Sequence, residues 1–148
     1  EGRVVIQTNA PGHRAIRLCT KHDYKTFYNL EIGDRLRTLF PPFAVFVRAQ
    51  FACADENAAA DAAERFANGV TKTILTALKP ANAENELVFA LAGAAPIRRR
   101  EGLFRYAVII KLVRTANTAA AINAIYAFSD GCADECYRGI EVNPQDML

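Results

Sequence analysis

The sequence predicts an α+β protein: a four-stranded antiparallel sheet with two helices, preceded by an N-terminal arm made of a strand and helices. Pro41-Pro42 ends any preceding helix, because proline lacks an amide donor and disfavours helical geometry in the residue before it. Residues 43–50 then alternate with period two and are rich in aromatic and β-branched side chains, which indicates a strand. We therefore expect an arm over residues 1–40 and the main domain over residues 41–148.

The arm begins with a short β-type run, Arg3–Thr8, followed by a turn-prone stretch that contains Pro11-Gly12. A single strand is not stable alone, so we expect this run to pair with the main sheet or with another chain. Residues 13–40 show helical spacing of apolar side chains. His22-Asp23 marks an expected break between two helices, with Asp23 as the N-cap of the second helix.

The sequence of the main domain predicts alternating strands and helices. The expected elements are a strand at 43–51, a helix from Asp55-Glu56 to Lys79-Pro80, a polar connector at 81–86, a strand at 87–92, a turn at 93–97, a charged hairpin loop at 98–102, a strand at 104–113, a helix with the stripe Ala119, Ile122, Ile125 and Tyr126 that ends at Asp130-Gly131, and a strand at 137–142 that ends at Asn143-Pro144. This βαββαβ order is that of the ferredoxin-like fold, with both helices on one face of the sheet.

Composition and length limit the function classes. The 148 residues suffice for one main domain, and no apolar run approaches the roughly 20 residues of a membrane-spanning helix. The net charge of +2 is close to neutral, so only the local distribution of charge can indicate a nucleic-acid partner. Because the chain starts at Glu1 and its only methionine is Met147, we expect it to be a piece of a longer, cytoplasmic protein.

Candidate catalytic and metal-binding residues do not form a recognisable set. Cys132 and Cys136 are four residues apart, but Cys19, Cys53 and the two histidines offer no second close pair for zinc. We expect neither a metal nor a disulfide at these cysteines. No phosphate-binding motif of the GxxxxGK[ST] or GxGxxG type occurs. We therefore expect no catalytic residue, no bound cofactor and no ATP hydrolysis.

Basic residues gather in one part of the sequence, where the only acidic residue is Glu101. Aromatic residues are interleaved with them, as on surfaces where arginines meet phosphates and rings meet bases. The alternative is a solvated hairpin without a ligand. The candidate nucleic-acid-binding residues are Arg98, Arg99, Arg100, Arg105, Tyr106, Lys111 and Arg114. We expect Arg98, Arg99, Arg100 and Arg105 to contribute most of the affinity, with Arg105 on the opposite face of its strand from Phe104 and Tyr106.

Several motifs resemble, in their order and spacing, the C-terminal part of the primosomal protein N′ family of bacterial replication-restart DNA helicases. The residues that carry this resemblance are Gly2–Asn9, His22-Asp23-Tyr24, Phe27-Tyr28, Glu31, Arg35, Pro41-Pro42-Phe43, Gly93–Ile97, Phe104-Arg105-Tyr106, Val108–Lys111 and Val142-Asn143-Pro144. Asn143 stands where the family commonly has Asp, and the turn at 93–97 is shortened.

The resemblance implies that residues 1–40 are the end of the second helicase lobe. It implies that residues 41–148 are a DNA-binding domain similar to a small-subunit ribosomal protein. The parent would be an ATP-dependent helicase whose ATP, Mg²⁺ and zinc sites lie upstream. Its implied partners are single-stranded or forked DNA, other primosome proteins and single-stranded-DNA-binding protein. Two alternatives stay open: an RNA-contacting ribosomal-type module, and a ferredoxin-like regulatory or dimerisation domain.

Overall fold

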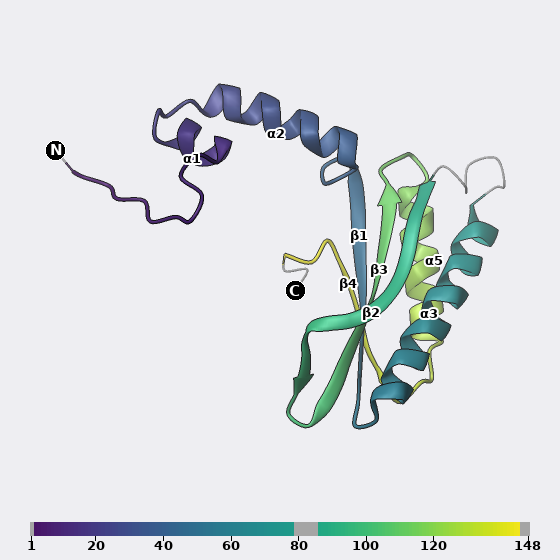
Figure 1. Ribbon diagram of the computed structural model, residues 1–148. Coiled ribbons are helices and arrows are strands. Elements are labelled where there is room, and N and C mark those ends of the chain that lie inside the picture. The colour runs from purple at the N-terminus through teal and green to yellow at the C-terminus, as the bar shows by residue number, and fades with distance from the viewer. Residues whose placement is uncertain (1, 79–85, 146–148) are drawn as a thin grey trace. The chain divides into compact units, whose positions relative to one another are not determined.

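The computed structural model describes residues 2–78 and 86–145 (Figure 1). The chain divides into two compact units, and the division falls between Leu39 and Phe40. The predicted connector at 81–86, apart from Glu86, and the predicted helix end at Lys79-Pro80 lie outside the described residues.

The first unit contains two helices, α1 (Arg14–Cys19) and α2 (Tyr24–Thr38). The predicted break at His22-Asp23 is confirmed: the Asp23 carboxylate accepts a hydrogen bond from the Thr26 amide at 3.1 Å and so caps α2. Neither helix contains a buried residue. The helices therefore enclose no core of their own.

The strand that we expected at Arg3–Thr8 is not formed in the structure. Residues 2–8 have no regular secondary structure, and Val4 and Val5 are 88% and 82% exposed. The prediction was wrong because β-type composition favours a strand only where a neighbouring strand supplies hydrogen bonds and a surface on which to pack.

The second unit is a four-stranded antiparallel sheet with two helices on one face (Figure 1). Its strands lie in the order β2-β3-β1-β4, and all three strand pairs are antiparallel. The elements are β1 (Ala44–Cys53), α3 (Glu56–Ala77), β2 (Leu87–Arg100), β3 (Leu103–Val113), α5 (Thr118–Asp130) and β4 (Tyr137–Val142). The predicted α+β fold class and the βαββαβ order are confirmed.

The two helices bury their apolar sides against the sheet. Asp55 caps α3 by accepting a hydrogen bond from the Ala58 amide at 2.7 Å, and α3 buries one side that includes Phe66, Val70 and Ile74. The stripe predicted for α5 was partly wrong, since Ala119 and Tyr126 are exposed while Ala121 and Ile125 are buried. Apolar residues surround α5 on most sides, so the sequence period does not fix which side faces the sheet.

The core lies between the helices and the sheet. Phe51 and Phe66 are in edge-to-face contact with ring centroids 5.5 Å apart, and Phe66 stacks on Tyr137 at 5.6 Å. The largest fully buried side chains all belong to this unit: Val47, Phe51, Val70, Ile74, Val108, Ile110, Leu112 and Ile125. No helix in the described part of the second unit covers the opposite face of the sheet, which we call the open face (Figure 1).

Strand β2 is longer than predicted and changes direction partway along (Figure 1). Its pairing with β3 shifts by three residues between Ala94 and Arg99, so the stretch expected to be a turn is a wide bulge that contains Pro96. Proline is tolerated in a bulge of an edge strand because no ladder hydrogen bond requires its amide. The predicted charged loop at 98–102 is thus mostly strand: Arg99 pairs with Phe104 and Arg100 with Leu103, and only Glu101 and Gly102 form the turn.

Candidate nucleic-acid interface

The strands β2 and β3 form a hairpin that carries four of the candidate arginines. Arg98 lies in the bulge and is held by Glu56 at the start of α3: its Nε donates to Oε1 of Glu56 at 2.6 Å. The hydroxyl of Tyr106 donates to the same oxygen at 3.2 Å. The hydrogen bond with Glu56 raises the pKa of Arg98 above its usual value. Arg98 is therefore anchored against the domain, although its side chain is still 63% exposed.

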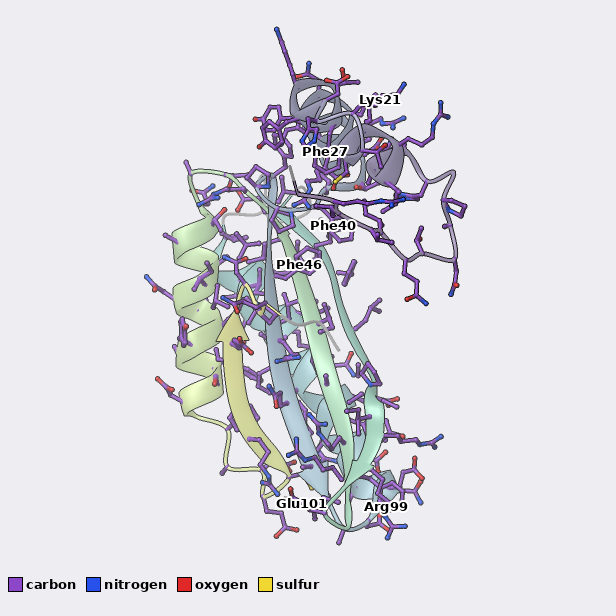
Figure 2. The ribbon with its side chains drawn as sticks, turned by 90° about the vertical axis from the view of Figure 1, so that its left-hand side faces the viewer. Lys21, Phe27, Phe40, Phe46, Arg99 and Glu101 are labelled. Carbon is purple, nitrogen blue, oxygen red and sulfur yellow. The ribbon has the colours of Figure 1, made fainter. Side chains whose placement is uncertain are left out.

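Arg99 and Arg100 lie at the end of the hairpin, next to the turn at Glu101 and Gly102. Figure 2 shows Arg99 far from Phe40 and Phe46, which lie at the other end of the sheet. The Arg99 guanidinium is 5.0 Å from the centre of the Phe104 ring, a distance typical of cation–π contact. Arg100 is 3.3 Å from Glu101, and both side chains are mostly exposed. These two arginines have the freedom to meet phosphates without breaking a buried interaction.

Arg105 and Tyr106 lie on opposite faces of β3, as the alternation of side chains along a strand predicted. Tyr106 packs against the core under the helices, so its ring is not an exposed platform for a base. Arg105 is on the open face, because it pairs with Ala52, which alternates with the buried Phe51. Arg105 is thus brought to the same hairpin as Arg99 and Arg100, but on the face opposite the helices.

Lys111 and Arg114 lie at the opposite end of β3. Lys111 is only 7% exposed, and its ammonium lies 4.9–5.7 Å from the ring centres of Phe40, Phe46 and Phe89. An ammonium enclosed by three rings supports the packing of those rings. Arg114 is exposed just beyond β3, and its amide donates to the Phe43 carbonyl at 2.9 Å. The structure therefore divides the predicted basic window between two ends of the sheet.

Two arginines that the sequence analysis did not select join Arg105 on the open face. Arg48 of β1 and Arg138 of β4 line the same small hollow as Arg105. They are far from residues 98–114 in sequence, so clustering along the chain could not reveal them. The signal that could have found Arg48 is a charged residue in the middle of a mostly apolar strand.

Cys136 is buried, and burial together with a hydrogen bond that its thiol donates to the neighbouring Cys53 raises the pKa of Cys136 to about 12. Cys136 is therefore protonated at neutral pH, a state that disfavours metal ligation and nucleophilic attack. Among residues 2–78 and 86–145, no three histidine, cysteine or acidic side chains come together as a metal site would require. None of the helices in these ranges is long and apolar enough to span a membrane.

The fold and the basic hairpin define a small α+β module with arginines on one exposed hairpin and on one open sheet face. Over 124 residues, or 84% of the chain, the sequence is 29% identical to replication restart protein PriA of Bacillus subtilis (strain 168). Over 84 residues, or 56% of the chain, it is 36% identical to replication restart protein PriA of Treponema pallidum (strain Nichols). A search of protein-family models finds no match.

The chain is therefore similar in sequence to a part of replication restart protein PriA. The matches span only 14% and 12% of the length of these two relatives.

Proposed function

We propose that this chain is a non-catalytic, DNA-binding part of a replication-restart protein. The proposal is that it holds single-stranded or branched DNA through the arginines of the β2–β3 hairpin. The observation that carries it is the exposed pair Arg99 and Arg100 at the end of the hairpin, with Arg98 anchored beside them. Cations there attract phosphates without specifying sequence, which suits a protein that recognises the form of DNA.

The relation to PriA supports a role in replication restart. By the motif resemblance, the longer protein is an ATP-dependent helicase in which ATP, Mg²⁺ and zinc bind outside this chain. Other primosome proteins and single-stranded-DNA-binding protein are its proposed partners, and the cytoplasm is its proposed compartment. Because the sequence contains no phosphate-cradling motif, the isolated chain should not hydrolyse ATP, with or without DNA.

The test is the binding of fluorescently labelled single-stranded and forked DNA, measured by anisotropy at several salt concentrations. Replacing Arg99 and Arg100 with alanine should weaken binding and flatten the log–log salt dependence by about 1.4, since each single-strand phosphate contact contributes about 0.7. The matched control is Arg3→Ala with Arg17→Ala, which removes the same charge from two exposed positions in the first unit.

Equal effects of the two double variants would show that only net charge matters and would contradict a hairpin site. Tighter binding of duplex RNA than of forked DNA would instead favour a ribosomal-type RNA module. Circular dichroism of each variant establishes that the fold is intact.

A further inference from the structure

A small hollow of about 40 Å³ lies on the open face of the sheet, beside the bulge of β2. Three arginines line it, one from each of three strands: Arg48 from β1, Arg105 from β3 and Arg138 from β4. Gln50 lines it too, and its side-chain amide can donate hydrogen bonds. Among the described residues, only one acidic side chain, that of Glu141, pairs with these three arginines, so their charge is not balanced.

Strand pairing brings these arginines together. Arg48, Gln50 and Ala52 alternate along β1 and therefore share one face of the sheet. Arg105 pairs directly with Ala52, which places its side chain on that same face. Arg138 follows Tyr137 at a shift in the pairing of β4 with β1, and its guanidinium donates to the Ala52 carbonyl at 2.6 Å.

Two of the three guanidinium groups are held in place by the protein. Arg48 is 15% exposed and donates to the Glu141 carboxylate at 2.9 Å. Arg138 donates to the backbone carbonyls of Glu135 and Tyr137 as well as to Ala52. Rigid donors of this kind lose little entropy when they bind an anion.

Arg105 differs from the other two because, within the described residues, its side chain makes no hydrogen bond to the protein. Within the part of the chain that the structure describes, no acidic side chain forms an ion pair with it. Glu141 is paired with Arg48 in this cluster, so the hollow carries an excess of positive charge. Arginine stays protonated in proteins, and a partly buried guanidinium gains from an anion that completes its hydrogen bonds.

We propose that this hollow binds one phosphate group of a single-stranded nucleic acid that runs along the open sheet face toward the end of the hairpin. The inference rests on the proposed function and extends it, because it names a second contact on a different surface. Arg100 pairs with Leu103, two residues before Arg105, so Arg100 and Arg105 share the open face of the hairpin, whereas Arg99 pairs with Phe104 on the other face. A strand held at the hairpin end thus passes the hollow, whereas a free phosphate ion gains nothing from Arg99 and Arg100.

The test uses Arg105→Ala, Arg105→Lys and, as the matched control, Lys72→Ala, which removes one exposed positive charge from α3. The probe is a labelled oligothymidylate, with binding measured by anisotropy over a range of salt. Arg105→Ala should weaken binding about ten-fold and flatten the log–log salt dependence by about 0.7. Arg105→Lys should keep the salt dependence but not the full affinity, because lysine lacks the planar fork of donors. Lys72→Ala should match the wild-type chain.

A second readout is the NMR signal of the Arg105 Nε–H group. It should shift when the oligonucleotide is added and shift far less with inorganic phosphate at the same concentration. Equal shifts with both probes would assign the hollow to a free anion and overturn the proposal. Equal affinities and salt slopes for Arg105→Ala and Lys72→Ala would also overturn it. A loss of binding in the variant lacking Arg99 and Arg100, with no loss in Arg105→Ala, would leave the proposed function intact and refute only this inference.

Discussion

Residues 2–39 and residues 40–145 form helices with the same kind of cap, but only the second region packs its helices into a core. Each region has a helix with an aspartate N-cap and a glycine in its interior, namely α2 with Asp23 and Gly33, and α3 with Asp55 and Gly69. In the first region no helical residue is buried, whereas α3 buries seven residues. Caps and propensities therefore form a helix in both regions, but only the second region converts a helix into a core.

The helices of the first region carry exposed ion pairs and bury no core residue. Glu31 is 2.9 Å from Arg35 one turn later in α2, and Asp34 pairs with both Arg14 and Arg37. Hydrogen bonds from these two arginines lower the pKa of Asp34. Exposed pairs of this kind contribute little to the free energy of unfolding. The comparison thus predicts that matched substitutions in the two regions have unequal effects.

The largest difference is expected for phenylalanine. Phe51 is 1% exposed and contacts Phe66 and Tyr137, so Phe51→Ala should lower the free energy of unfolding by about 3–5 kcal/mol. Phe27 in α2 is only partly buried, and Phe27→Ala should cost less than about 1 kcal/mol. Urea denaturation followed by far-UV circular dichroism measures both. Equal losses would mean that the first region contributes to the cooperative core.

The two interior glycines should give effects of opposite sign. A Cβ at Gly69 would overlap the ring of Phe128, so Gly69→Ala should destabilise the second unit by about 1–2 kcal/mol, even after the gain in helix propensity. A Cβ at Gly33 would meet no atom within 4 Å, so Gly33→Ala should stabilise α2 by up to about 1 kcal/mol. Thermal unfolding of both variants tests this prediction. Stabilisation by Gly69→Ala would show that the Phe128 ring can move away from the new Cβ without loss of stability.

The smallest difference is expected at the helix caps. Asp55→Ala removes the acceptor for the Ala58 amide and should cost about 1 kcal/mol of global stability, because α3 is part of the core. Asp23→Ala removes the same kind of bond to Thr26, yet it should change only the helicity of α2. Amide hydrogen exchange separates the two results. Faster exchange in β1 or β3 of Asp23→Ala would contradict the independence of α2 from the core.

The sequence predicts most of the second unit because its signals are local. Asp55 ahead of a clear apolar stripe indicates α3, and the alternation after Pro41-Pro42 indicates β1. The errors arose where a tertiary partner decides the outcome. The β-type run at residues 3–8 has no strand beside it in the described chain. Three consecutive arginines were expected in a loop, although pairing with β3 holds Arg99 and Arg100 in a strand. Propensity describes a residue's preference, and pairing can overrule it.

The sequence could predict only part of the candidate site, because strand pairing decides the rest. Arg98, Arg99 and Arg100 are neighbours along the chain, so their concentration of charge can be read directly. Arg48 and Arg138 join Arg105 only through the register of three strands and the pairing shift in β4. A one-residue change in that register would move Arg48 to the helix-covered face. Predicting such a cluster requires the register itself.

The bulged outer half of β2 also bears on how the protein behaves at high concentration. Because β2 is at one end of the strand order, its free side could add a strand from a second molecule and begin a growing assembly. Pro96 and the arginines that follow it oppose such addition by removing a donor and by mutual repulsion. We therefore expect the side chains proposed to hold DNA also to disfavour edge-to-edge association. Removing Arg98, Arg99 and Arg100 together should therefore raise light scattering in concentrated samples, whether or not DNA is present.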